Sequence, residues 1–195
     1  MRIIGGSARG RRLLAPGRQF GQAVRPTSDR AREALFNIIR DEVAGRSVLE
    51  LFAGTGALGL EAVSRGAASV LFVEGNRAVA DLIQRNIDLC GFNDQARLVV
   101  RDLTKGMAFL AELTPASGFG LILLDPPYAS GLAEKVLAEL AQLAIVGTDG
   151  LVVAEVGRKE VLPEQFGSLW CSDHRRYGEA AFWLYRARGG SNEHL

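Results

Sequence analysis

The tetrapeptide Asp125-Pro126-Pro127-Tyr128 carries the groups in this 195-residue chain that are best suited to chemistry. Two consecutive prolines fix φ and remove two N–H donors, so a stiff loop presents only acceptors, the Asp125 carboxylate and the Pro126 carbonyl. A neutral –NH2 group needs two acceptors, and the exocyclic amine of a nucleic-acid base is such a group. Both hydrogen bonds would hold the nitrogen in place and stabilise the positive charge that grows on it during attack. Tyr128 offers a flat face for an extruded base, so the loop predicts a reaction at a base amine.

A glycine-rich segment, Gly54-Thr55-Gly56-Ala57-Leu58-Gly59, matches GxGxxG between an expected strand and an expected helix. The glycines permit a tight turn and close backbone approach, and the helix N-terminus leaves N–H groups free. The motif alone fits a nicotinamide or flavin dinucleotide, S-adenosylmethionine (SAM), or simply a tight strand-to-helix turn. The residues in and just before this segment that we expect to contact a cofactor are Phe52, Ala53, Gly54, Thr55 and Gly56.

Three acids at the ends of three successive expected strands narrow the choice of cofactor. Glu50 precedes the glycines, where a carboxylate would oppose a pyrophosphate but suit the ammonium group of SAM, while the methionine carboxylate rests on the helix N-terminus. Glu74 can accept hydrogen bonds from ribose hydroxyls, which does not separate SAM from a dinucleotide. Asp102, followed by Leu103, can accept one from the adenine amine. Because ligands bind at the carboxyl edge of a parallel sheet, the three acids favour SAM.

The first 32 residues are strongly basic. They hold eight arginines, no lysine and one acid, a net charge of +7, which leaves −6 for the rest because the whole chain carries +1. The planar fork of arginine suits phosphates and base edges, so this composition favours contact with nucleic acid over a solubilising arm. The residues that we expect to contact nucleic acid, which the family resemblance given below implies is RNA and to which it adds Thr27, are Arg2, Arg9, Arg11, Arg12, Arg25, Thr27 and Arg30.

Strands that alternate with helices must position these groups, which predicts a mostly parallel, doubly wound α/β sheet of the Rossmann-like SAM-dependent methyltransferase class. The expected strands are 47–53, 69–74, 96–102, 119–125 and 150–156, and a closing antiparallel hairpin spans 169–175 and 180–187. The expected helices run from the glycine turn to about Arg65, from Arg77 to about Leu89 and from about Leu132 to Leu143, with a short one after the third strand. A glycine-rich turn between Arg2–Gly5 and Arg11–Ala15 predicts an N-terminal β-hairpin. A helix capped by Thr27 or Ser28 follows, with Arg30 and Arg32 near its exposed first turns.

The length predicts one methyltransferase domain over residues 27–188, preceded by a basic arm over 1–26 and followed by a flexible tail over 189–195. No apolar run reaches the roughly 18 residues of a membrane span, and the N-terminus lacks the apolar core of a secretory signal. Cys90 and Cys171 form no CxxC pair and lie away from the candidate loops, so we expect reduced thiols in a cytoplasmic protein. Two histidines are too few to suggest a metal site, and we expect a monomer without metal.

Together these motifs predict direct in-line methyl transfer from SAM to an amine, without a covalent enzyme intermediate. Asp125 or water could take the proton that leaves the amine after methylation. A dinucleotide-dependent oxidoreductase shares the glycine loop and Glu74, but it leaves the Asp125–Tyr128 loop unexplained. A non-catalytic ribosome-assembly factor that only binds RNA is a further alternative.

Nearly the whole chain resembles the bacterial RsmD-type methyltransferases. Their distinctive N-terminal segments correspond to residues 2–11 and 25–37, and their cofactor and catalytic loops to 51–59 and 125–128. Tyr177-Gly178 matches a Tyr-Gly pair near the family's last strands. The resemblance implies that the target is the N2 amine of a guanine in 16S ribosomal RNA, within an assembled small subunit. The residues themselves leave adenine N6 in DNA or RNA open.

Overall fold

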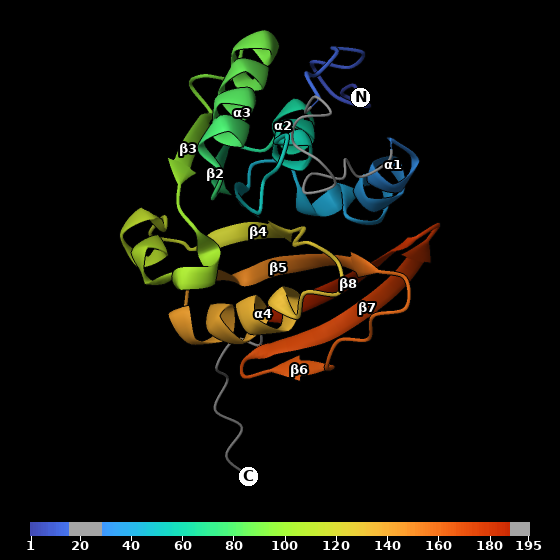
Figure 1. The fold of residues 1–195 in the computed structure, drawn as a ribbon, viewed down its shortest axis with the longest axis vertical. Helices are drawn as coiled ribbons and strands as arrows, with labels where there is room; N and C mark the ends of the chain where they lie inside the picture. The colour runs from blue at the N-terminus through green and yellow to red at the C-terminus, as the bar shows by residue number, and fades with distance from the viewer. Residues whose placement is uncertain (16–28, 188–195) are drawn as a thin grey trace.

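The computed structural model describes residues 1–15 and 29–187 (Figure 1). The expected tail, the boundary between arm and domain at residue 26, and the expected helix caps Thr27 and Ser28 lie outside these residues. Within them, no helix is both long and apolar enough to cross a membrane.

One eight-stranded sheet forms the centre of the molecule, in the order β3-β2-β1-β4-β5-β8-β7-β6. The first five strands in this order run parallel, and β8, β7 and β6 are antiparallel additions at one edge. The strands are β1 (Ser47–Leu51), β2 (Ser69–Glu74), β3 (Ala96–Val100), β4 (Phe119–Leu124), β5 (Val146–Gly157), β6 (Gln165–Phe166), β7 (Leu169–Tyr177) and β8 (Ala180–Ala187). The predicted Rossmann-like, mostly parallel sheet with a C-terminal antiparallel hairpin is confirmed.

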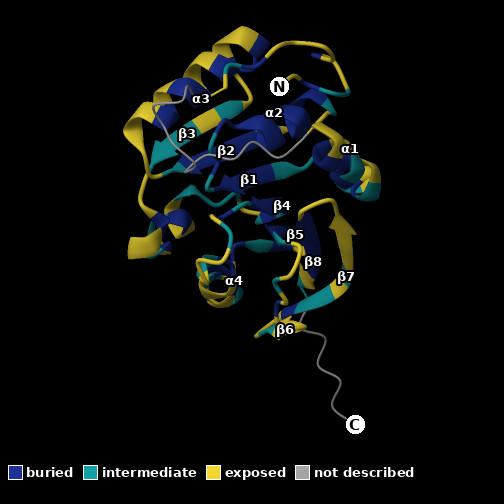
Figure 2. Cartoon of the chain, turned by 45° about the vertical axis from the view of Figure 1, so that its right-hand side comes forward, coloured by how far each residue is buried: buried dark blue, intermediate teal, exposed yellow. Residues whose placement is uncertain are grey.

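Helices cover both faces of this sheet. They are α1 (Asp29–Ile38), α2 (Ala57–Ser64), α3 (Arg77–Cys90) and α4 (Leu132–Leu143), with 3-10 turns η2 (Arg40–Glu42), η3 (Leu103–Lys105) and η4 (Ala108–Leu113). Figure 2 shows that α2 is buried throughout, whereas α3 and α4 turn exposed faces to solvent. Tertiary packing around α2 explains why its short sequence forms a stable helix.

Two hydrophobic clusters lie on opposite faces of the sheet because successive strand residues point to opposite sides. Val48 and Leu121 join the cluster under α1, α2 and α3, whereas Leu49 and Ile122 join the one under α4. Parallel strands buried on both faces must be apolar throughout, which is why they are readable as continuous apolar runs in the sequence.

The structure departs from the predicted elements at three places. The expected N-terminal hairpin is reduced to one antiparallel bridge, Arg2–Arg12, with flanking backbone hydrogen bonds. Strand β5 begins at Val146 rather than Gly150, and its pairing with β4 shifts register between Phe119 and Leu121. The glycines of this irregular stretch resemble a turn in sequence, so the strand start was missed. The two-residue strand β6 was not predicted at all.

Candidate functional site

The two predicted loops meet where the winding of the sheet reverses. Strand β1 lies between β2 and β4, and Leu51 at the end of β1 is in register with Leu124 at the end of β4. The backbone N–H of Asp125 donates to the carbonyl of Leu51 over 3.4 Å. The glycine loop that follows β1 and the Asp125 loop that follows β4 are therefore neighbours at a topological switch point, where open α/β sheets bind ligands.

The glycine loop has the unusual backbone that its sequence allows. Gly54 and Gly56 have φ of 54° and 73°, a region that favours glycine. Phe52 also has a positive φ, 56°, which is uncommon for a large side chain and concentrates at functional sites. Gly56 is the N-cap of α2 and has no side chain with which to cap the helix, but the Glu50 carboxyl accepts from Gly59 N in the first turn.

Glu74 fixes this loop from the neighbouring strand. One of its carboxylate oxygens accepts a 3.0 Å hydrogen bond from Gly54 N, and the other accepts one of 2.8 Å from Asn76 N. Asn76 in turn caps α3 by accepting from Ala78 N and Val79 N. The half-buried Glu74 thus lies beside the glycines, where its remaining lone pairs can accept from hydroxyl groups of a ligand.

Asp102 follows the third parallel strand and is exposed, and buried Leu103 follows it. Its carboxylate accepts hydrogen bonds from the hydroxyl and the N–H of Thr104, at 2.7 and 3.0 Å. These bonds hold the pKa of Asp102 below its usual value, so it is ionised near neutral pH. The second oxygen lies 3.9 Å from the Lys105 amine, and the contact of Asp102 with a ligand amine stays a prediction.

Glu50 points into the protein. Only 2% of it is exposed, and its carboxyl accepts a 2.8 Å hydrogen bond from Gly59 N in the first turn of α2. Burial raises its pKa to about 8, against the lowering effect of this bond, so the group is mostly protonated at pH 7. The side chain supports the glycine loop from beneath, and its contact with an ammonium group stays a prediction.

The Asp125–Tyr128 loop is held against β5. The hydroxyl of Tyr128 donates to a carboxylate oxygen of buried Glu155 over 2.8 Å, and the Tyr128 ring lies close to Gly157. Glu160 accepts from Ala129 N and Gly157 N, at 3.0 and 2.8 Å, and so joins the end of the loop to the end of β5. Asp125 and Tyr128 are half-buried, Pro126 is buried and Pro127 is exposed. Two side chains, one in β5 and one in the turn that follows it, therefore fix the Asp125–Tyr128 loop.

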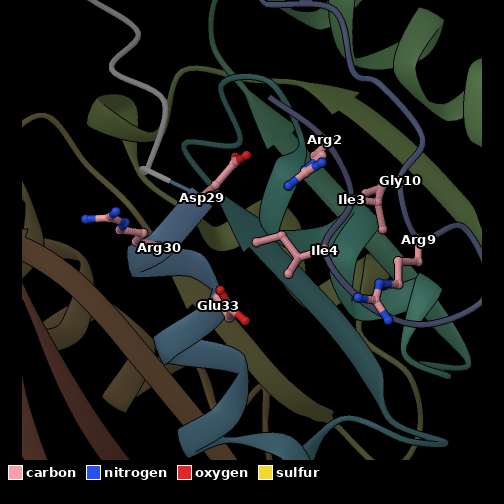
Figure 3. Close-up of a pocket in the computed structure, with 8 residues that line it drawn as sticks. All are labelled: Arg2, Ile3, Ile4, Arg9, Gly10, Asp29, Arg30 and Glu33. Carbon is pink, nitrogen blue, oxygen red and sulfur yellow. The ribbon is translucent and has the colours of Figure 1, made fainter.

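The arginines in the described part of the N-terminal arm, residues 1–15, lie on the surface. Arg2, Arg9, Arg11 and Arg12 are all exposed, as is Arg30 at the start of α1. A pocket of about 310 Å³ opens between the arm and α1 (Figure 3). Its lining residues are Arg2, Ile3, Ile4, Arg9, Gly10, Asp29, Arg30 and Glu33. Three of the predicted RNA contacts thus share one pocket, whereas Arg25 and Thr27 lie outside the described residues.

Arg32, expected near the exposed turns of α1, is fully buried. It donates to the Arg2 carbonyl and to Asp29, and its Nε lies 3.8 Å from a carboxylate oxygen of buried Glu61 in α2. The prediction for Arg32 was wrong because its buried acidic partner is 29 positions away in sequence. The buried charge is tolerated because these acids compensate it.

Several residues that position the site escaped the sequence analysis. Asn76, Glu155 and Glu160 each interact with a predicted loop or its neighbour, and Asn86 of α3 bonds to the carbonyl of Thr55 over 3.0 Å. Asn76 was detectable as a helix N-cap immediately before an apolar-periodic run. The other three contact loops more than 25 residues away, and a single sequence holds no signal for such pairings.

The hydrogen-bond acceptors at this edge of the sheet fit the hydroxyl and amine groups of a nucleoside. Glu74 ends β2 and Asp102 follows the neighbouring strand β3, and each offers carboxylate oxygens suited to hydroxyl and amine groups. The positive-φ backbone at Gly54 and Gly56 lets a ligand approach the glycine loop closely, whereas the first turn of α2 is partly occupied by the Glu50 carboxyl. A thiol nucleophile is disfavoured, because burial raises the pKa of both Cys90 and Cys171.

Known proteins that are similar to this chain match it along nearly its whole length. The family described as Conserved hypothetical protein 95 matches residues 1–186. Ribosomal RNA small subunit methyltransferase D of Escherichia coli K12 is 34% identical over 194 residues, which cover 98% of this chain and 93% of that protein. A protein of Haemophilus influenzae with the same name is 31% identical over 95% of this chain and 93% of its own length.

Solved structures agree in fold. A Thermus thermophilus protein of 32% identity superposes with a TM-score of 0.78, over 94% of this chain and 98% of that one. An RNA methyltransferase from Salinibacter ruber, solved with S-adenosyl-L-homocysteine, is only 14% identical but has a TM-score of 0.64 over 88% and 99% of the two chains. The fold of this chain is therefore that of methyltransferases.

Proposed function

We propose, because the chain belongs to the RsmD family of methyltransferases, that it transfers a methyl group from SAM to the N2 amine of a guanine in 16S ribosomal RNA. Membership makes the chain a SAM-dependent methyltransferase, as the sequence predicted. The RNA and the atom that is methylated are the proposal.

One observation carries it: the glycine loop and the Asp125 loop adjoin at the ends of β1 and β4. Either loop by itself fits several kinds of protein. Side by side at the switch point, they set a cofactor platform next to a loop rich in acceptors. A dinucleotide oxidoreductase would use the first loop but has no use for the second.

SAM, when bound, supplies an electrophilic methyl group on a sulfonium. The Asp125 carboxylate and the Pro126 carbonyl accept hydrogen bonds from the two amine protons of the base, which orients the nitrogen for in-line attack. The same bonds stabilise the positive charge that develops on nitrogen as the N–C bond forms and the S–C bond breaks. Tyr128, fixed by Glu155 and Gly157, gives the extruded base a surface on which to stack.

On the cofactor side, Glu74 accepts from ribose hydroxyls and Asp102 from the adenine amine. Phe52, Ala53, Gly54, Thr55, Gly56 and Leu103 shape the platform around the cofactor. The exposed arginines of the arm and Arg30 bind the RNA backbone. Arg25, one of the arginines of the basic arm, and Thr27, which the family resemblance adds, belong to the same proposed RNA-binding set.

The names of the E. coli and H. influenzae relatives, which are small-subunit rRNA methyltransferases, support 16S rRNA as substrate. The residues of the site fit any amine-bearing base, so the guanine rests on the family resemblance. We further propose that the enzyme acts on an assembled small subunit in the cytoplasm, as a monomer and without metal.

The test is methyl transfer from radiolabelled SAM to small subunits isolated from cells that lack this protein. Nuclease digestion then identifies the labelled nucleoside, with protein-free 16S rRNA tested in parallel. We expect the label in N2-methylguanosine, with subunits preferred over free RNA. Label in an adenosine would be consistent with the proposed mechanism but would refute guanine as the target base. No label in subunits, free RNA or DNA would refute the proposed reaction.

A further inference from the structure

The N-terminal arm is built into the methyltransferase domain through the buried helix α2. Glu61 accepts hydrogen bonds from Ile4 N and Gly5 N, at 2.7 and 2.8 Å, and it is also paired with Arg65. Ser64 accepts from Ala8 N at 2.9 Å and donates to the Gly5 carbonyl at 2.6 Å. These bonds fix the turn of the arm, residues 4–8, against the C-terminal half of α2.

The two ends of the arm reach the cofactor loop instead. The hydroxyl of Thr55 donates to the Met1 sulfur over 3.7 Å, and Met1 O accepts from Leu13 N over 3.2 Å. On the other side, Asn86 of α3 bridges Leu14 and Thr55. Met1 at the start of the arm therefore contacts the glycine loop directly, and Leu14 near its end reaches the loop through Asn86.

Asn86 makes this bridge with nearly all of its hydrogen-bonding capacity. Its side-chain oxygen accepts from Leu14 N at 2.7 Å, and its –NH2 group donates to Leu14 O at 3.2 Å and to Thr55 O at 3.0 Å. The side-chain amide of Asn86 accepts from and donates to the backbone of Leu14, as a neighbouring strand would. Its other N–H donates to the glycine loop at Thr55. Asn86 is fully buried, so water cannot replace any of these bonds without rearrangement.

We propose that Asn86 is a positioning residue that holds the RNA-binding arm and the cofactor loop in one fixed register. A ligand that orders the glycine loop then also orders the exit of the arm, because Thr55 and Leu14 share one rigid amide. Bound cofactor should favour the arm position that binds RNA, and by thermodynamic reciprocity bound RNA should favour the cofactor. The names of the two ligands rest on the proposed function, whereas the mechanical link between arm and loop does not.

Hydrogen exchange at the Leu14 amide tests this link without any RNA. Added S-adenosylhomocysteine, the non-reactive product form of the cofactor, should slow Leu14 exchange in the native protein by about five-fold or more. In Asn86→Ala this amide should exchange rapidly, and S-adenosylhomocysteine should no longer change its rate. Gln84→Ala, on the exposed face of the same helix, is the matched control and should behave as the native protein.

A second variant covers the case in which Asn86→Ala does not fold. Leu14→Pro removes the N–H that Asn86 accepts but leaves the bond between Asn86 and Thr55 in place. It should retain S-adenosylhomocysteine affinity and raise the KM for small subunits about five-fold or more at unchanged kcat. Asn86→Asp, which keeps the acceptor and loses both donors, should fall between the native protein and Asn86→Ala.

Two results would overturn the proposal. One is the absence of any S-adenosylhomocysteine effect on Leu14 exchange in the native protein. The other is an equal effect in Asn86→Ala, which would place the link elsewhere in the arm. Failure of methyl transfer to RNA is a separate outcome, because it would refute the proposed function and leave the exchange result unaffected.

Discussion

At the scale of single residues, Glu50 combines an acidic side chain with almost complete burial. Its pKa of about 8 in the folded protein lies far above the value of 4.5 for an exposed glutamate, with burial as the main cause. Between these two pH values the unfolded chain has lost the proton and the folded protein retains it. Ionisation therefore favours unfolding, and the contribution of Glu50 to stability falls as the pH rises from about 4.5 to about 8.

Glu50→Gln should remove this pH dependence. The amide stays neutral and can still accept from Gly59 N, so the variant should gain stability over the native protein as the pH rises from about 5 toward 8. Urea midpoints of both proteins at these pH values measure the change. Parallel profiles would mean that Glu50 ionises in the folded protein as easily as in water. A lower SAM affinity of the variant would support the predicted contact with the ammonium group.

We propose two separable roles for Tyr128, fixing the loop and stacking on the base, and two substitutions distinguish them. Tyr128→Phe loses the bond to Glu155 and keeps the ring, so we expect a stability loss of about 1–2 kcal/mol and a nearly unchanged KM for RNA. Tyr128→Ala also loses the ring, and stacking is worth about 1–3 kcal/mol per base, so kcat/KM should fall about ten-fold or more. Steady-state kinetics measure both. Equal activity of the two variants would argue against stacking.

At this scale the sequence predicted the position of the candidate side chains along the sheet better than it predicted which way they point. The groups of the Asp125–Tyr128 loop, Glu74 and Asp102 all lie at the carboxyl edge because strand ends fix that position. The inward turn of Glu50 and the burial of Arg32 depend on α2 packing, which brings Gly59 and Glu61 to them. Charged residues are usually exposed, so burial of Glu50 and Arg32 is unexpected from the sequence. It follows only from their contacts with Gly59 and Glu61 in the folded protein.

At the scale of elements, the close packing of α2 on β2 requires glycine at position 59. A Cβ there would lie 2.5 Å from the Phe72 ring and 2.7 Å from the Glu50 carboxyl. Gly59→Ala should therefore shift α2, destabilise the protein by about 1–3 kcal/mol and weaken SAM binding. Calorimetric binding and thermal unfolding measure the two effects.

Gly45→Ala is the control for this substitution. Gly45 has a positive φ, 73°, but open space surrounds the added Cβ, so only backbone strain of about 1–2 kcal/mol is expected. Its SAM affinity should match that of the native protein. If both variants lose SAM affinity equally, the loss reflects stability and not the position of α2.

The elements were predictable where one local pattern decides them. The apolar runs of β2 and β4 and the helical period of α4 gave nearly correct bounds, since parallel strands are buried on both faces and α4 has one apolar face. Strand β6 and the start of β5 depend on tertiary pairing instead. The arm forms only one bridge because α2 and Asn86 satisfy the backbone groups of Ile4 and Leu14, while a few backbone bonds, such as Ile3 N to Arg11 O, join its two sides.

At the scale of the whole molecule, we propose that the basic arm binds RNA and that the Asp125–Tyr128 loop carries the chemistry. Replacing Arg9, Arg11 and Arg12 with alanine should weaken RNA binding and reduce the slope of log affinity against log salt by about 2–3. SAM affinity should not change, because these exposed side chains lie outside the contacts that anchor the arm. Binding titrations at several salt concentrations provide the measurement, with Arg40→Ala/Arg85→Ala as control. Equal loss of both affinities would show that the arginines are structural.

The central claim is that the ends of β1 and β4 form one site for methyl transfer to an amine. Single-turnover transfer from pre-bound labelled SAM by Asp125→Ala tests it most directly, because binding and chemistry are then measured separately. We predict a fall of about 100-fold or more in the transfer rate, with the fold and both affinities retained. An unchanged transfer rate would contradict the assignment of Asp125 and place the chemistry outside this loop.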